Sequence, residues 1–325
     1  MSVYTHVSEA EFIELLSHYD LGQLESYEGI KAGITNTNYF LSTRTSTQNL
    51  QQFVFTVFEE DSVEDLSYFL QLKAFLRERG ILCPMPMADR EGQFLRTMHD
   101  KPVAIVEKLS GHTVENISEH HCRIIGKALA KLHITAKDFP VRRNNNRGSE
   151  WRRMTYNKVA EKLNTEDKPL LKQHVDELET SDFSSLPTSV VHCDLFWDNV
   201  LFYNEGENTQ LGGLIDFYYA CDDYCLYDIA IVANDWCTNS NGEIIVSKLT
   251  ALLKAYNAER PFTDAENAHW HNMLKMAAVR FWLSRLQDKL FPKSGELTFI
   301  KDPDEVKHVL LNHVKHPTAT LYELL

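Results

Sequence analysis

Hydrophobic and polar residues alternate in the first part of the chain, and this alternation predicts β-strands. Residues 26–44 (SYEGIKAGITNTNYFLSTR) and 51–60 (QQFVFTVFEE) each predict strands bounded by turn residues. Between Ser62 and Gly80 the apolar residues recur at helical spacing, so one long helix is expected there. Residues 91–111 predict two further strands. This part of the chain is therefore expected to form a sheet with a helix packed against it.

Helical patterns flank this β-rich part. A short amphipathic helix is expected after Ser8, because Ser8 and Glu11 have the spacing of a capping box. A chain of 325 residues is long for one hydrophobic core. Helices predominate from residue 108 onward, which predicts an N-terminal lobe of residues 1–107 and a C-terminal lobe of residues 108–325. Helical patterns of the second lobe begin near Ile124 and cover residues 166–180, 246–256 and 265–290, with a polar loop at residues 142–150.

Composition and charge narrow the functional classes. Acidic residues outnumber basic ones by 46 to 33, the formal net charge is −13, and no long basic stripe is present. A nucleic-acid partner is therefore not expected. The first residues, MSVYTHVSEAEF, lack the basic and apolar segments of a signal peptide, and no window approaches the roughly 18 apolar residues of a membrane helix. The sequence predicts a cytoplasmic protein without a membrane partner.

The six cysteines are scattered and form no CxxC pair. Reduced thiols are expected instead of disulfides, because the chain is not a small disulfide-rich scaffold. A zinc site at Cys221, Cys225 and Cys237 is disfavoured, since the sequence offers neither a convincing fourth ligand nor the spacing of a zinc knuckle.

The segment VVHCDLFWDNVLF places three polar residues, His192, Asp194 and Asn199, in an otherwise apolar run that predicts a strand, a loop and a second strand. A second acid, Asp216, ends a later apolar strand and is followed by Phe217. Phosphoryl transfer from ATP requires an acid that orients the acceptor hydroxyl and oxygen ligands for Mg²⁺. We expect Asp194 to be the base, Asn199 and Asp216 to be the metal ligands, and His192 to hold the loop.

Other interpretations of these residues remain open. Each acid or amide alone is more typical of a loop stabilised by side-chain caps, and the catalytic interpretation rests on the joint motif. A nucleophilic pair of Cys193 and His192 is disfavoured, because adjacent residues on an extended chain point to opposite sides. Asp228 begins an apolar helix, and we expect it to support the loop through backbone amides instead of taking part in the chemistry.

Three segments, VVHCDLFWDNVLF, LIDFYYACDDYCLYDIA and AAVRFWLSRLQD, resemble the aminoglycoside-phosphotransferase-like kinases, and specifically their homoserine kinase branch. The resemblance covers nearly the whole chain. It implies an α+β fold of the two-lobed, protein-kinase-like type, with a β-rich N-terminal lobe, a mainly helical C-terminal lobe and ATP in the cleft. It also implies magnesium-dependent phosphorylation of the L-homoserine hydroxyl for threonine biosynthesis. No nucleic acid or membrane is needed, and the chain is expected to be a monomer or a homodimer.

The nucleotide site follows from the resemblance. A turn between the first two strands is expected to cover the phosphates, and backbone groups at the lobe junction are expected to contact the adenine. Thr56 stands where such kinases usually have a lysine, so a nucleotide-binding pseudokinase is one rival interpretation. The candidate residues for binding nucleotide are Gly33, Thr35, Asn36, Thr37, Asn38, Glu107 and Leu109.

The acceptor site must recognise an α-carboxylate and an α-ammonium group while the hydroxyl faces Asp194. A guanidinium and an acid suit these two groups, and Arg280 and Asp223 are the candidates, with Tyr218 beside them. A structural ion pair is the alternative role for Arg280, and residues 144–151 form a second candidate for covering the acceptor. Another small-molecule kinase of the same fold, acting on an amino alcohol, an aminoglycoside or a sugar, is the second rival interpretation.

Overall fold

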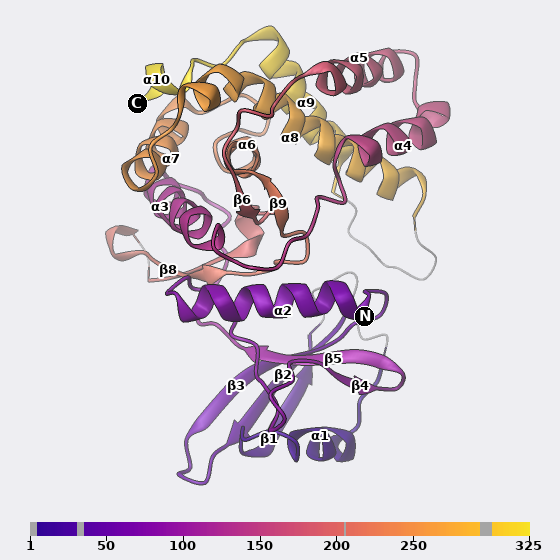
Figure 1. The fold of residues 1–325 in the computed structure, drawn as a ribbon, viewed down its shortest axis with the longest axis vertical. Coiled ribbons are helices and arrows are strands. Elements are labelled where there is room, and N and C mark those ends of the chain that lie inside the picture. The colour runs from indigo at the N-terminus through magenta and orange to yellow at the C-terminus, as the bar shows by residue number, and fades with distance from the viewer. Residues whose placement is uncertain (1–4, 31–35, 205, 293–300) are drawn as a thin grey trace. The chain divides into compact units, whose positions relative to one another are not determined.

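The computed structural model describes residues 5–30, 36–204, 206–292 and 301–325. The chain forms two compact units, which are called here the N-terminal unit, ending at Ser110, and the C-terminal unit, beginning at Gly111. This division lies three residues beyond the boundary at residue 107 that the sequence predicts. Figure 1 shows that the first unit is rich in strands and that helices predominate in the second. The α+β class predicted from the sequence is confirmed.

The N-terminal unit is built on a five-stranded antiparallel sheet with the strand order β1-β2-β3-β5-β4. In Figure 1 this sheet lies between the helices α1 and α2. The described elements of this unit are α1 (Glu9–Leu16), β1 (Gln23–Gly29), β2 (Thr37–Arg44), β3 (Leu50–Val57), α2 (Val63–Glu78), β4 (Arg96–Met98) and β5 (Lys101–Glu107).

The alternation predicted from the sequence positions the core of this unit. Tyr39 and Phe55 project from neighbouring strands onto one face, where the ring of Phe12 from α1 lies 5.3 Å and 5.2 Å from their rings. Each such aromatic pair adds about 0.5–1.5 kcal/mol to the free energy gained by burying its surface. The helix α1 begins with the expected capping box between Ser8 and Glu11. Helix α2 likewise begins after Ser62, whose hydroxyl accepts a hydrogen bond from the amide of Asp65 at 3.1 Å.

The C-terminal unit packs helices around two small antiparallel sheets, one made of β6 and β9 and the other of β7 and β8. In Figure 1, α6 lies near the middle of this unit, with α3, α7 and α8 around it. The helices of this unit are α3 (Glu119–Ala136), α4 (Ser149–Val159), α5 (Asp167–Thr180), α6 (Cys225–Trp236), α7 (Val246–Glu259), α8 (Asp264–Leu290), α9 (Pro303–Lys315) and α10 (Leu321–Leu324). Its strands are β6 (Thr188–Val191), β7 (Val200–Tyr203), β8 (Gln210–Leu214) and β9 (Cys221–Tyr224), and short 3₁₀ turns occur at Ala160–Lys162, Trp197–Asn199 and Gly206–Asn208.

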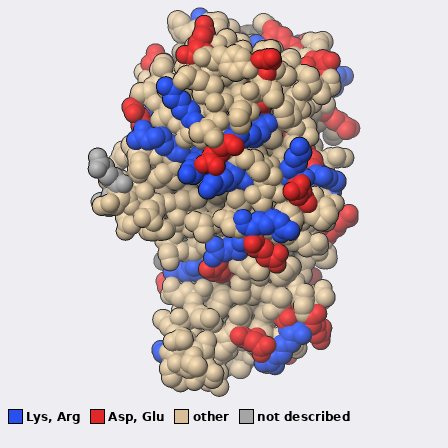
Figure 2. All heavy atoms as spheres, turned by 60° about the vertical axis from the view of Figure 1, so that its left-hand side comes forward, with Lys and Arg blue, Asp and Glu red and all other residues tan. Residues whose placement is uncertain are grey.

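All of the helices expected in this unit are present, and the polar loop expected at residues 142–150 overlaps the first two residues of α4, which begins at Ser149. Three helices, α4, α9 and α10, are additional to the sequence prediction. Figure 2 shows that acidic and basic side chains lie interspersed on the displayed face. Among the helices that the structure describes, none is both long enough and apolar enough to cross a membrane.

Candidate active site

The loop between β6 and β7, residues 192–199, carries Asp194 and Asn199 and is called here the catalytic loop. The side-chain amide of Asn199 donates a hydrogen bond to the backbone oxygen of Asp194 at 2.8 Å, and its nitrogen lies 3.4 Å from a carboxylate oxygen of Asp194. The loop closes with a 3₁₀ turn at Trp197–Asn199. These contacts fix Asp194 and Asn199 relative to each other.

Asp228, in the first turn of the buried helix α6, accepts hydrogen bonds from the backbone amides of His192 and Cys193 at 2.8 Å and 2.9 Å. Its carboxylate also lies 3.1 Å from Nε2 of His133 on α3. Burial alone raises the pKa of Asp228, but the hydrogen bond and charge of His133 outweigh it and hold that pKa below its usual range. An anionic carboxylate therefore anchors the start of the catalytic loop.

His192 connects the catalytic loop to the segment that follows β8. Its Nε2 lies 2.9 Å from the backbone oxygen of Ile215, and its ring packs 4.5 Å from that of Phe217. Burial lowers the pKa of His192, so the imidazole is neutral and donates this bond through Nε2. The sulfur of Cys193 lies 3.6 Å from that of Cys221. All six cysteines are free thiols in the structure, which agrees with the sequence prediction.

The side chain of Asp194 is only 16 % exposed, whereas that of Asp198, the other acid of the loop, is 37 % exposed. Burial raises the pKa of Asp194, whereas the charges of Arg280 and Lys301 act in the opposite direction. One carboxylate oxygen lies 3.6 Å from Nη1 of Arg280. This distance is an ion pair but is longer than a hydrogen bond, so the carboxylate keeps the capacity to accept a proton donor.

Asn199 and Asp216 lie at the same end of the β7–β8 hairpin. Val200 pairs with Leu214, and the amide of Ile215 donates to the backbone oxygen of Asn199 at 3.0 Å. Asp216 is exposed and has a positive φ of 64°. Because Asn199 uses its NH₂ group toward Asp194, its amide oxygen remains available, and amide and carboxylate oxygens are hard donors of the kind that Mg²⁺ prefers.

Arg280 on α8 is buried, with 3 % of its side chain exposed. Its guanidinium carbon lies 3.7 Å from the ring centre of Phe281 and 5.1 Å from that of Tyr219, and its Nε has no hydrogen-bond partner among the described residues. Tyr218, which precedes Tyr219 in the chain, is half-buried. The arginine that the sequence proposes for the acceptor thus lies beside Asp194.

Asp223 on β9 is half-buried and faces the start of the catalytic loop. Its carboxylate accepts hydrogen bonds from the Asn145 side chain at 2.5 Å and from the Tyr224 amide at 2.7 Å. One of its oxygens lies within 4.8 Å of the sulfur of Cys193, and Cys221 belongs to the same group. Burial raises the pKa of Asp223 above its usual range despite these donors. Cys225 and Cys237, the partners of Cys221 in the disfavoured zinc interpretation, are not part of this group.

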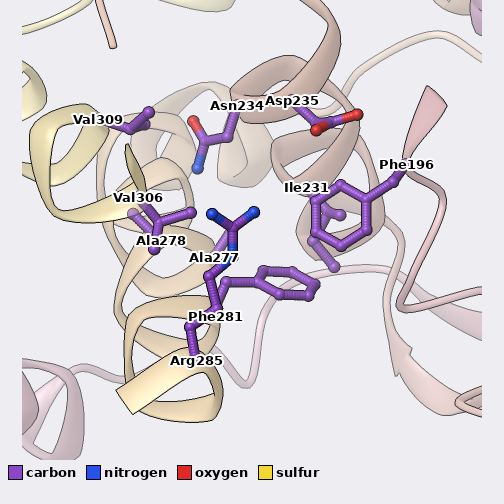
Figure 3. A pocket seen from close by; sticks show the side chains of 10 residues that line it. All are labelled: Phe196, Ile231, Asn234, Asp235, Ala277, Ala278, Phe281, Arg285, Val306 and Val309. Atoms are coloured by element: carbon purple, nitrogen blue, oxygen red, sulfur yellow. The ribbon is translucent and has the colours of Figure 1, made fainter. Parts of the chain in front are cut away.

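A cavity of about 30 Å³ lies behind the catalytic loop. Figure 3 shows the Arg285 guanidinium between its lining residues, with the rings of Phe196 and Phe281 on one side. This volume suits about one water molecule and is too small for an amino acid. Asn234 lines this cavity and uses its side-chain amide toward Leu274 and His313.

Two further acids are associated with the catalytic loop: Asp235, which lines this cavity, and Asp198, which belongs to the loop. Asp235 accepts a hydrogen bond from the amide of Trp197 at 2.8 Å, and burial raises its pKa to about 7. Asp198 pairs with Lys301 at 2.8 Å. Nothing in the sequence pattern distinguishes these residues from other surface acids, and they were not among the predicted site residues.

The candidate nucleotide residues belong to the N-terminal unit. Gly33 and Thr35 lie outside the described residues. The Thr37 hydroxyl donates to Glu59 at 2.8 Å, and Glu59 also pairs with Lys101. The side chain of Asn36 accepts the Glu59 amide at 3.1 Å. These contacts hold the start of β2 against the end of β3.

Thr56 and the lobe junction can also be placed within this unit. Thr56 donates to the Asn38 side chain at 2.7 Å, so these two residues satisfy each other. Lys101 on β5 forms an ion pair with Glu59. Glu107 donates its amide to Met85 at 2.8 Å and pairs through its side chain with Arg77. The amide of Leu109 has no hydrogen-bond partner in the described part of the unit.

Comparisons with known proteins place these residues in a family context. The model of a phosphotransferase enzyme family matches residues 26–262. A homoserine kinase of Methylobacillus flagellatus (strain ATCC 51484) is 44% identical, covering 100% of this chain and 98% of that protein. A homoserine kinase of Cupriavidus necator is 37% identical over 97% of this chain and 96% of its own length.

Solved structures show the same fold at low sequence identity. An amicoumacin kinase has a TM-score of 0.71 at 17% identity, and the alignment covers 98% of each chain. A spectinomycin phosphotransferase has a TM-score of 0.64 at 14% identity, also with 98% of each chain covered. The kinase-like fold expected from the sequence is therefore confirmed.

Proposed function

The chain belongs to the phosphotransferase enzyme family, and on this premise we propose that it is an ATP-dependent homoserine kinase. The observation that carries the substrate is full-length identity of 35–44% to several proteins named homoserine kinase. The reaction converts L-homoserine and ATP to O-phospho-L-homoserine and ADP, a step of threonine biosynthesis. The arrangement of Asp194, Asn199 and Asp216 supports a phosphotransferase of this kind.

In the proposed reaction Asp194 accepts the proton of the acceptor hydroxyl as that oxygen attacks the γ-phosphorus. One P–O bond forms to the acceptor, the bond between the γ-phosphorus and the bridging oxygen breaks, and ADP leaves with the electron pair. Arg280 favours the carboxylate form of Asp194, and the Asn199 amide fixes its position. His192 and Asp228 position the loop without contacting the substrate.

The amide oxygen of Asn199 and the carboxylate of Asp216 are the residues that would hold Mg²⁺. The ion would neutralise charge on the phosphates of ATP during transfer. Within the N-terminal unit, the proposed nucleotide contacts are Asn36, Thr37 and Asn38 at the start of β2. The free amide of Leu109 and the backbone of Glu107 are proposed to contact the adenine.

For the acceptor, we propose that Arg280 binds the α-carboxylate and that Asp223 faces the α-ammonium group, with Tyr218 beside them. The guanidinium lies next to Asp194, as an acceptor with a hydroxyl at that carboxylate requires. The half-buried Asp223 carboxylate gains a compensating charge when an ammonium binds. A cytoplasmic location and a monomeric or homodimeric state remain predictions.

An ADP-release assay with L-homoserine, choline, L-serine and L-threonine tests this function. The expected result is a kcat/KM for homoserine that exceeds the values for the other acceptors by at least tenfold. Preference for another acceptor would contradict the assignment of homoserine as the substrate but not the assignment of kinase activity. Binding of ATP without turnover of any acceptor would favour the pseudokinase that Thr56 suggests.

A further inference from the structure

The loop before α4 is fixed alongside β9, and this brings Arg147 toward the acceptor residues. The Asp222 amide donates to the backbone oxygen of Arg143 at 2.8 Å, and the Arg143 amide donates to the Asp222 carboxylate at 2.8 Å. Further along the two segments, the side-chain NH₂ group of Asn145 donates to the Asp223 carboxylate at 2.5 Å. The oxygen of the same Asn145 side chain accepts the Arg147 amide at 2.7 Å. One asparagine therefore positions both Asp223 and Arg147.

Arg147 and Arg280 approach the same aromatic ring from two elements. The guanidinium carbon of Arg147 lies 5.7 Å from the ring centre of Tyr219, and that of Arg280 lies 5.1 Å from it. Trp151 packs against Arg147 at 4.7 Å. The Nε atoms of both arginines are buried and have no hydrogen-bond partner among the described residues. The aromatic rings orient the two planar groups but leave both Nε–H donors without an acceptor among the described residues.

These contacts link the acceptor residues in a continuous series that begins at Asp194 and returns to Cys193, the residue before it. Asp194 pairs with Arg280, Arg280 lies over Tyr219, and Tyr219 also contacts Arg147. Arg147 is tied through Asn145 to Asp223, whose carboxylate lies within 4.8 Å of the sulfur of Cys193, the residue before Asp194. The series contains two cations whose Nε–H donors lack an acceptor among the described residues, and one half-buried acid, in addition to the base.

Two guanidinium groups near one ring repel each other unless an anion lies between or beside them. In the described residues Arg147 has no ion pair, and the acid paired with Arg280 is Asp194, which the reaction itself requires. A carboxylate supplies the missing charge and accepts hydrogen bonds from both planar groups. An ammonium group on the same small molecule would then neutralise Asp223.

We propose that Arg147 is a specificity-determining residue, and that together with Arg280 it holds the α-carboxylate of an amino-acid acceptor over Tyr219. This inference rests on the proposed function and deepens it. It defines the acceptor class as a zwitterionic amino acid with a terminal hydroxyl. Arg147 itself takes no part in proton transfer.

The test compares wild type with Arg147→Gln and Arg147→Lys. The acceptors are L-homoserine and 3-aminopropan-1-ol, which keeps the ammonium and the hydroxyl but lacks the carboxylate. Arg147→Gln is expected to raise the KM for homoserine ten- to a hundredfold, because charged hydrogen bonds to the carboxylate are lost. The KM for ATP and the kcat/KM for 3-aminopropan-1-ol are expected to change less than twofold. Arg147→Lys is expected to restore part of the homoserine affinity.

Arg153→Gln is the matched control, since Arg153 is a neighbouring exposed arginine on α4 that pairs with Glu179. It is expected to leave all constants unchanged, and thermal unfolding verifies that each variant folds. If turnover of 3-aminopropan-1-ol is too slow to measure, its inhibition constant against homoserine serves in its place.

The outcomes separate this inference from the proposed function. A wild-type enzyme that prefers homoserine, together with an unchanged homoserine KM in Arg147→Gln, overturns the inference alone. Equal losses of kcat/KM with both acceptors would assign Arg147 a role in folding, and a raised KM for ATP would assign it a role in phosphate binding. Either result also overturns the inference. A wild-type enzyme that accepts only alcohols without a carboxylate overturns the proposed function and the inference together.

Discussion

At the scale of single residues, the candidate site depends on acids whose surroundings differ. Burial disfavours the ionised form of Asp194, and the charge of Arg280 favours it. Asp228 is held anionic by His133 and two backbone amides. Cys193 and Asp216 both have positive φ values, near 63° and 64°, which cost about 1–2 kcal/mol each for a residue with a side chain. The Cys193 conformation persists because its amide is bound by Asp228.

The first prediction concerns the base. Asp194→Asn is expected to lower kcat by about a hundredfold or more, because an amide cannot accept the hydroxyl proton. The fold and the affinity for ATP are expected to remain, as judged by thermal unfolding and nucleotide titration. Activity within tenfold of wild type would remove Asp194 from this role.

The second prediction concerns the metal. Asp216→Ala is expected to raise the magnesium concentration needed for half-maximal turnover, and excess magnesium is expected to restore activity in part, because one oxygen ligand has been removed. A titration of turnover against magnesium measures both effects. An unchanged magnesium dependence would exclude Asp216 from the metal site.

The third prediction concerns the buried pair of His133 and Asp228. Burial by itself lowers the pKa of His133, but Cys225 and the Asp228 carboxylate outweigh this effect and raise the pKa to about 9. A raised histidine pKa stabilises the fold fully below the ordinary value of 6.5, and this stabilisation is lost as the pH rises through about 9. We expect the free energy of unfolding to fall by about 3 kcal/mol between these pH values.

Urea unfolding of wild type and His133→Gln at pH 6.5 and pH 9 isolates this contribution. The variant should be less stable at the lower pH and should show a weaker decline toward the higher pH. A wild type and variant with parallel pH profiles would show that His133 does not carry the dependence.

At the scale of elements, the catalytic loop is held by β6 and β9 on one side and by the β7–β8 hairpin on the other, with α6 supplying Asp228. The helices α3 and α7 pack closely against each other, and His133 on α3 contacts Asp228, the residue that holds the start of the catalytic loop. Gly126 makes this close approach possible. A Cβ atom at this position would lie 2.3 Å from the backbone oxygen of Leu252 on α7.

The fourth prediction follows from that distance. Gly126→Ala is expected to reduce the free energy of unfolding by about 1–3 kcal/mol, although alanine favours helices, because the backbone of α7 must move. Lys131→Ala, an exposed position on the same helix, is the control. A Gly126→Ala variant as stable as wild type would show that the two helices separate without cost.

The same elements show what the sequence can and cannot predict. The capping box at Ser8, the alternation that buries Tyr39 and the polar residues in the segment containing Asp194 are local patterns, and each gives a correct local structure. Helix α4 was not predicted because its buried face mixes polar and apolar residue types, which weakens the helical pattern of apolar positions. The buried residues of this face are Arg152, Thr155, Tyr156 and Val159.

Arg147 shows a second limit of sequence reasoning. It shares a short polar loop with Arg142 and Arg143, and no local pattern distinguishes the three. Only the fold shows that Arg142 pairs with Asp222 at the surface whereas Arg147 approaches Tyr219. Contacts between residues about 70 to 80 positions apart in the chain depend on the packing of β9 against this loop, and the periodicity of the sequence does not encode that packing.

At the scale of the whole molecule, two units with separate cores divide the proposed tasks. The N-terminal unit buries the aromatic face of its sheet beneath α1, and the C-terminal unit contains Asp194, Arg280 and Asp223. The net charge of −13 is compatible with an anionic nucleotide, because local donors and Mg²⁺ determine its binding more than the total charge does. The assignment of nucleotide to one unit and acceptor to the other remains a prediction.

Hydrogen exchange measured by mass spectrometry gives the fifth prediction. A non-hydrolysable ATP analogue with magnesium is expected to slow exchange within residues 85–110, and L-homoserine is expected to slow exchange within residues 143–151 and 217–224. Each ligand should protect only its own segment, because backbone amides that bind the ligand or are covered by it take part less often in the local opening that permits exchange. Asp223→Asn should weaken the homoserine effect without changing that of the nucleotide, since its proposed partner is the ammonium group. Protection by homoserine confined to residues before Ser110 would contradict the division of tasks, even if the protein proved to be an active kinase.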